Sequence, residues 1–145
     1  MTELEKFHQK FRIPDFTIRA YDHWIWSLRP VHSTLGAGVL SLRRYEPHFG
    51  GMTPAEGTEL ATVVKDVETK LEAAYAYDKI NYLMLMMVDP HVHFHVLPRY
   101  EGARTAAGLT APDMGWPGQP DLGQAIKLDA GQIAALTGWL KPYFA

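Results

Sequence analysis

The sequence predicts an α+β fold, in which about five antiparallel strands form one sheet and a long helix packs across it. Short runs of β-branched and aromatic residues bounded by turn residues indicate the strands, and one strongly capped amphipathic pattern indicates the helix. The chain has 145 residues, of which 47% are hydrophobic and 21% charged, and this is typical of one domain with its own core. We therefore expect residues 1–145 to form a single domain.

The first half of the chain supplies three strands and the long helix. Residues 16–21, 24–28 and 38–42 are rich in apolar, β-branched and aromatic side chains and are separated by turn residues, as antiparallel neighbours are. Residues 53–56 (Thr-Pro-Ala-Glu) form a capping box with proline at the first helical position. Apolar residues then recur at helical spacing as far as Tyr75, which predicts about five turns with one face on the sheet.

The second half supplies two further strands and a shorter helix. Residues 80–88 (INYLMLMMV) are too apolar for a half-exposed strand and predict a central strand covered on both faces. Residues 91–97 follow as the next strand. Residues 101–128 are dense in Gly and Pro, which predicts a loop. Residues 129–144 then predict a C-terminal helix, capped by Asp129.

The composition excludes several classes of function. The chain has no cysteine, so it forms no disulfide scaffold and has no thiol nucleophile, which fits a cytoplasmic protein. A net charge of -2 argues against binding to polymeric nucleic acid. No segment approaches the roughly 20 apolar residues of a membrane span, and the N-terminal region has no signal-peptide pattern.

Three of the seven histidines stand at alternate positions, as His91, His93 and His95. Because alternate side chains of a strand point to the same face, the three imidazoles are expected to line one surface of the sheet. The intervening side chains are hydrophobic and would enter the core on the other face. The spacing therefore predicts a functional site on this strand.

Two kinds of chemistry fit this cluster. A zinc site needs nitrogens about 2.0–2.1 Å from one ion, but the outer Cα atoms lie roughly 13 Å apart on a strand. A metal would therefore be held by two of the three together with His23, His32 or His48. Alternatively, one imidazole is a nucleophile, because neighbours at this spacing can both touch a phosphate and disfavour each other's protonation.

The segment HVHFHVLPRY at residues 91–100 resembles the signature of the histidine-triad (HIT) family of nucleotide hydrolases and transferases, His-φ-His-φ-His-φ-φ, where φ is hydrophobic. The similarity extends to the glycine-containing strand at residues 35–44 and to the helix start at residues 53–56, and it fades after Glu101. The resemblance implies a HIT-like α+β domain.

The resemblance also implies a mechanism. His93 would attack the α-phosphorus of a nucleotide to give a covalent nucleotidyl-histidine, His91 would orient it, and His95 would contact the phosphate and bridging oxygen. Water would then release the nucleoside monophosphate, with no cofactor and no metal. The substrates would be dinucleoside polyphosphates, nucleoside phosphoramidates or related esters. The family commonly forms homodimers with joined sheets, and the apolar residues 82–88 would suit that interface.

The sequence departs from the family pattern at two places. The position of a fourth histidine is occupied by Gly36-Ala37, and the polar loop before the triad is replaced by residues 86–89 (Met-Met-Val-Asp). Both changes predict weaker phosphate binding. The alternative function is therefore a metal-binding or regulatory nucleotide-binding module with little catalysis.

Three further residues are candidates for substrate binding. Arg99 is tied to the motif and could reach a phosphate. Asp89 would lie near the phosphate, which it would repel, or would hold a histidine tautomer. Trp116, between Gly115 and Pro117, would stack on a base or anchor its loop to the core.

Overall fold

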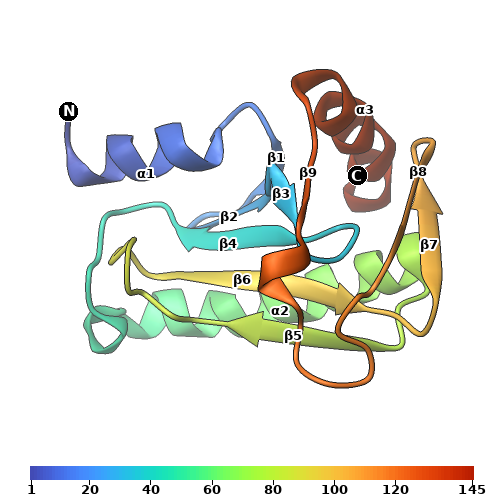
Figure 1. Cartoon of the computed structure of the whole chain (residues 1–145). Coiled ribbons are helices and arrows are strands. Elements are labelled where there is room, and N and C mark those ends of the chain that lie inside the picture. Colours follow the sequence, from blue (N-terminus) through green and yellow to red (C-terminus); the bar gives the residue numbers. More distant parts are fainter.

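The computed structural model describes all 145 residues and contains a five-stranded antiparallel sheet in the order β1-β2-β4-β6-β5 (Figure 1). The strands are β1 (Thr17–Ala20), β2 (Trp24–Leu28), β4 (Gly38–Leu42), β6 (His93–Arg99) and β5 (Lys79–Leu83). The α+β fold class with its five-stranded antiparallel sheet is therefore confirmed.

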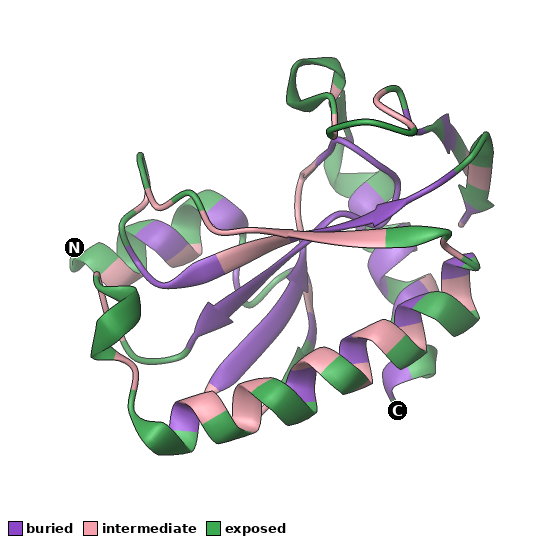
Figure 2. Ribbon diagram, turned by 90° about the horizontal axis from the view of Figure 1, so that it is seen from below, coloured by how far each residue is buried: buried purple, intermediate pink, exposed green.

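Helix α2 (Pro54–Tyr75) covers one face of the sheet. The capping box predicted at its start is present, with the Thr53 hydroxyl accepting from the Glu56 amide and the Glu56 carboxylate accepting from the Thr53 amide. The buried residues recur along the side that faces the sheet (Figure 2) and pack against Trp24 and Trp26 of β2. This face holds the main hydrophobic core.

Helix α1 (Glu3–Phe11) covers the opposite face, a position that the sequence analysis did not predict (Figure 1). Its Phe7 and Phe11 form a second, smaller core with Ile25 of β2 and Val39 of β4. Alternation along each strand thus sends even-numbered side chains of β2 and β4 toward α2 and odd-numbered ones toward α1.

The prediction that residues 80–88 form a central strand is wrong. β5 ends at Leu83 and pairs only with β6, so it is an edge strand, and it is half-buried to exposed where β2 and β4 are buried (Figure 2). Beyond it, Leu85, Met87 and Val88 are 57%, 85% and 84% exposed. The apolar run that indicated burial on both faces therefore lies largely at the surface of the single chain.

The C-terminal third completes the fold, and the segment predicted as a loop at residues 101–128 contains a hairpin instead. Strands β7 (Ala103–Ala106) and β8 (Leu109–Pro112) pair around Ala107 and Gly108, both at positive φ, as a two-residue hairpin turn requires. The remaining elements are β3 (Val31–His32) paired with β9 (Ile126–Lys127), helix α3 (Ala130–Leu140), and the 3-10 helices η1 (Phe49–Gly51), η2 (Leu122–Gln124) and η3 (Lys141–Phe144). None of the helices is long and apolar enough to cross a membrane.

Candidate active site

His93 is the first residue of β6 and is 2% exposed on the face covered by α1. Its Nδ1 lies 2.5 Å from the backbone carbonyl oxygen of His91. Because a carbonyl only accepts, Nδ1 carries the hydrogen and Nε2 carries the lone pair. Burial lowers the pKa of His93, which favours the neutral ring. The geometry thus supplies a neutral imidazole with a free nucleophilic nitrogen.

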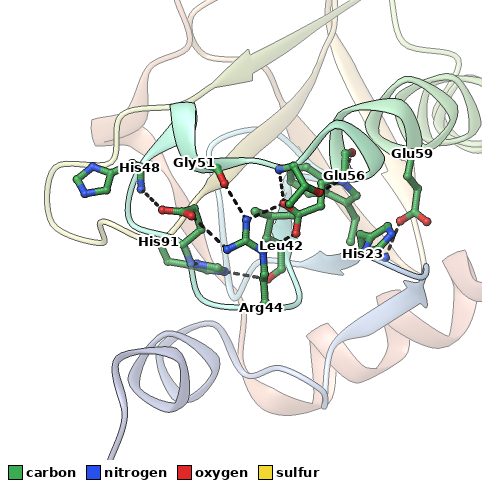
Figure 3. A network of polar contacts seen from close by, with 11 residues as sticks. His23, Leu42, Arg44, His48, Gly51, Glu56, Glu59 and His91 are labelled. Carbon is green, nitrogen blue, oxygen red and sulfur yellow. Dashed lines mark hydrogen bonds and ion pairs between the residues drawn. The ribbon is translucent and has the colours of Figure 1, made fainter.

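His91 is fixed by a network of polar contacts (Figure 3). Its Nε2 donates to the Leu42 carbonyl oxygen at 2.8 Å, and its Nδ1 accepts from the Glu46 amide at 3.2 Å, which defines one neutral tautomer. Arg44 holds the Glu46 and Glu56 carboxylates at 3.1 Å and 2.7 Å. The turn after β4 is therefore anchored to the start of α2. Through its bonds to the His91 ring it positions His91, whose backbone carbonyl orients His93.

His95 lies next to His93 on β6, with ring centroids 4.9 Å apart and the rings nearly perpendicular. Burial, together with the smaller effects of the nearby charges of Arg29 and His93, lowers the pKa of His95 to about 3. Its Nδ1 is buried and has no hydrogen-bond partner. His95 is therefore neutral at physiological pH and has hydrogen-bonding capacity to spare.

A cavity of about 190 Å³, here called the triad cavity, borders this cluster. It is lined by His93 and His95, by Lys10 and Phe11 of α1, and by residues 86–89. No group of three or more His, Asp or Glu side chains is placed to hold a single metal ion. The triad cavity can therefore present imidazole nitrogens to a small anion on the α1 face.

Helix α1 forms the roof of the triad. The Phe7 ring lies 4.9 Å from the His91 ring and 5.1 Å from the His93 ring, and Phe11 lies about 6 Å from both His93 and His95. Two sequence signals could have found this helix. One is the Thr2/Glu5 capping box, and the other is the pair of phenylalanines four residues apart, which lie on one helical face.

Asp89 is the one predicted substrate-binding residue that the structure brings to the triad, where it lines the triad cavity. Its carboxylate pairs with Lys10 Nζ at 2.6 Å and so ties the segment before β6 to α1. Asp89 makes no hydrogen bond to a histidine here, since its carboxylate accepts from Lys10 and Nδ1 of His93 donates to the His91 carbonyl.

Arg99 and Trp116 lie elsewhere. Arg99 is six residues beyond His93 on β6, roughly 20 Å along the strand, and its buried guanidinium pairs with Asp113 at 2.6 Å. Together with Trp116 it lines a different cavity, of about 720 Å³, that includes none of the three histidines. It is the largest of the cavities described, but its lining contains no His, Asp or Glu, and its two cations are the paired Arg99 and the exposed Lys79. The triad cavity is therefore the candidate active site.

Comparison with known proteins agrees with the motif and the fold. Residues 39–102 match the family model of the HIT domain. Over these residues the chain carries a HIT domain. The matched segment runs from β4 through the end of β6, so it includes the whole triad. A comparison with curated protein sequences gives no significant match.

Solved HIT structures share the whole architecture. A histidine triad protein from Sinorhizobium meliloti has a TM-score of 0.71 at 19% identity, covering 96% of this chain and 93% of that one. One from Marinobacter aquaeolei gives 0.70 at 20% identity, covering 92% of each chain. A hypothetical histidine triad nucleotide-binding protein from Sulfolobus tokodaii gives 0.68 at 18% identity, covering 89% and 83%. At these identities the likeness establishes the fold that the HIT domain adopts here.

Proposed function

We propose that this HIT protein is a nucleotidyl hydrolase or transferase that works through a covalent intermediate on His93. The Nε2 lone pair attacks the α-phosphorus, a P–N bond forms, and the bond from phosphorus to the leaving group breaks with its electron pair. His95 donates a hydrogen bond to the bridging oxygen as charge develops there. Water then attacks the phosphorus, the P–N bond breaks with its electron pair returning to Nε2, and the water proton passes to solvent. The nucleoside monophosphate leaves and His93 is neutral again.

One observation carries this proposal, which is the orientation of His93. A histidine whose Nδ1–H is held by a carbonyl presents its other nitrogen as a lone pair, and the ring borders a cavity of a size suited to a phosphate. Burial also lowers the pKa of His91 and His95, so both neighbours stay neutral. Neither then carries a positive charge that would weaken His93 as a nucleophile. The nucleotide-binding description of the Sulfolobus tokodaii neighbour supports a nucleotide as the substrate.

A trapping experiment tests the proposal. The protein is mixed in excess with a radiolabelled adenylyl substrate, either a diadenosine polyphosphate or adenosine phosphoramidate, and denatured at alkaline pH. We expect label on His93 that is stable to base and released by acid. His93→Ala should abolish the label, whereas His48→Ala, which changes an exposed histidine, should retain it. Equal hydrolysis rates for wild type and His93→Ala on these substrates would refute the proposal.

The alternative function, nucleotide binding with little catalysis, is favoured by the roof over the triad. Phe7 and Phe11 leave His93 only 2% exposed, and the apolar residues 86–88 offer no side-chain donors to a phosphate. Calorimetry with adenosine monophosphate separates the two functions. Binding of the monophosphate with no trapped adduct supports the module, and stoichiometric zinc with chelator-sensitive binding would support a metal-dependent one.

We also propose that the protein forms a homodimer through the β5 edge. β5 has no strand partner on its outer side, and the exposed Leu85, Met87 and Val88 follow it directly. An unpaired edge with adjacent apolar side chains favours pairing with a second copy. Sedimentation should give twice the monomer mass for wild type and a monomer for Met87→Glu/Val88→Glu, and a wild-type monomer at high concentration would contradict the dimer.

A further inference from the structure

Arg29 is the one arginine of this chain whose guanidinium has no partner in the protein. Of the seven arginines, the other six each donate to a protein oxygen. The side chain of Arg29 donates to none, and its Nε is buried. Arg29 is half-buried, and burial lowers its pKa although the nearby charge of Asp89 acts in the opposite direction, which expresses the cost of partly desolvating a charge that no protein group bonds. Such a cation has an unused capacity to bind an anion.

The backbone holds Arg29 firmly at the end of β2. Its amide donates to the Ala37 carbonyl at 3.1 Å, and its own carbonyl lies 2.5 Å from Nε2 of the buried His32. Odd-numbered residues of β2 face α1 and the triad, as Ile25 does, and Arg29 continues that alternation. The side chain therefore lies on the triad face without depending on a side-chain hydrogen bond.

Arg29 also stands between two cavities. It lines the triad cavity together with His93 and His95. It lines a second cavity, of about 200 Å³, together with His95 and Ser33 but without His93. Since Arg29, Leu85 and His95 line both cavities, a ligand that extends from His93 into the second cavity would contact these side chains. The charge of Arg29 also contributes to the lowered pKa of His95, more than that of His93 does.

We propose that Arg29 binds the phosphate adjacent to the one that His93 attacks, so that the protein prefers phosphoanhydride substrates, such as a nucleoside or dinucleoside polyphosphate, over phosphoramidates. This rests on the proposed function. When Nε2 of His93 attacks the α-phosphorus, the bond between the α-phosphorus and the bridging oxygen breaks. The electron pair stays on that oxygen, and the leaving phosphate gains a charge beside the guanidinium. A phosphoramidate leaves as an amine and gives Arg29 no second phosphate to bind.

Arg29 would also offset the loss of the polar loop. Residues 86–88 present no side-chain donors, and Lys10, the other cation of the triad cavity, is already paired with Asp89. A guanidinium can donate two parallel hydrogen bonds to one phosphate. Arg29, which lies outside the histidine motif, therefore supplies the positive charge for phosphate binding that the neutral histidines lack.

The test compares two leaving groups in the same enzyme. We expect Arg29→Gln to lower kcat/KM for diadenosine triphosphate by about 100-fold, as for loss of one charged transition-state donor, and for adenosine phosphoramidate by less than about threefold. Arg29→Lys should fall between, because lysine keeps the charge but not the paired donors. Arg43→Gln, which changes an exposed arginine bonded to the Tyr21 carbonyl, is the control. Equal losses on both substrates would overturn the proposal.

A binding measurement keeps this inference separate from the proposed catalysis. Calorimetry with inorganic pyrophosphate should show binding to wild type and to His93→Ala, and at least about tenfold weaker binding to Arg29→Gln. Absence of a trapped adduct in wild type, with Arg29-dependent pyrophosphate binding retained, would refute the catalytic role of His93 but not the phosphate subsite. Pyrophosphate affinity that is the same with and without Arg29 would refute the subsite. Because the guanidinium has no protein partner and its burial is unfavourable, Arg29→Gln should unfold at or above the wild-type temperature without ligand, which excludes a fold defect.

Discussion

The side chain of Arg99 forms a buried ion pair with Asp113 in the structure, whereas the sequence predicts that Arg99 binds substrate. The two side chains are 4% and 1% exposed, and the guanidinium donates to both carboxylate oxygens, at 2.6 Å and 3.2 Å. Removing one partner of a buried ion pair costs about 3–5 kcal/mol, because the other charge stays buried. Asp113 would keep its bonds from the Tyr100 and Gly115 amides, so we expect Arg99→Met to lose about 3 kcal/mol, the lower end of this range.

The pH dependence of this loss has a definite sign. Burial acts to raise the pKa of Asp113, but Arg99 and the backbone donors outweigh it and hold the pKa below the usual value of 3.8. A lowered carboxyl pKa means that the unfolded state takes up its proton first as the pH falls. The pair therefore contributes fully above about pH 4 and progressively less below it. The difference in stability between wild type and Arg99→Met should shrink as the pH approaches 3.

Urea unfolding followed by tryptophan fluorescence measures this difference, and thermal scans from pH 7 to pH 3 measure its pH dependence. Lys79→Met is the matched control, since Lys79 lies opposite Arg99 in the sheet but is exposed, and it should change stability by less than about 0.5 kcal/mol. Activity per folded molecule should be unchanged in Arg99→Met. An unchanged urea midpoint with a tenfold higher KM would refute the structural role and restore Arg99 as a substrate ligand.

Three further predictions concern the core and the triad. Burial lowers the pKa of His32 to about 4, so its unfolded form binds a proton first. Stability should fall by about 3 kcal/mol more in wild type than in His32→Asn between pH 6.5 and pH 4, as urea unfolding would show. Gly38→Ala would place a Cβ 2.3 Å from the buried Trp26 ring, costing at least about 1–3 kcal/mol in thermal unfolding, whereas Gly50→Ala meets nothing within 4 Å and should be tolerated. Because burial lowers the pKa of His93, the single-turnover rate should stay level from pH 8 to pH 6.5 and decline only below it; a midpoint above 6.5 would contradict this.

The elements that the sequence predicted correctly are those whose signals are local. Residues 24–28 and 38–42 coincide with β2 and β4, and the predicted capping box at Thr53 begins α2. The alternation of apolar and polar residues and the capping box each involve only a few consecutive residues, because they reflect the geometry of a single strand or helix. The spacing of the triad belongs to the same class of signal.

The errors arose where a local pattern has more than one tertiary outcome. An apolar strand can be buried by two neighbouring strands or left at an edge, and the run at residues 80–88 has the same composition in both cases. Helix α1 was not predicted because its sequence is mostly polar, and only two of its residues, Phe7 and Phe11, are buried. Arg99 follows the triad as a phosphate ligand would, but its partner comes 14 residues later, at Asp113.

The sequence by itself determined the α+β class, the long helix and the shared face of the three histidines, because each follows from the period of one continuous segment. Only the tertiary structure decided which nitrogen of His93 is free, that α1 covers the triad, and that Arg29 is the cation without a partner. Those properties depend on groups brought together from distant parts of the chain. A side chain's type fixes what it can bind, whereas the packing of distant segments fixes whether a partner is already there.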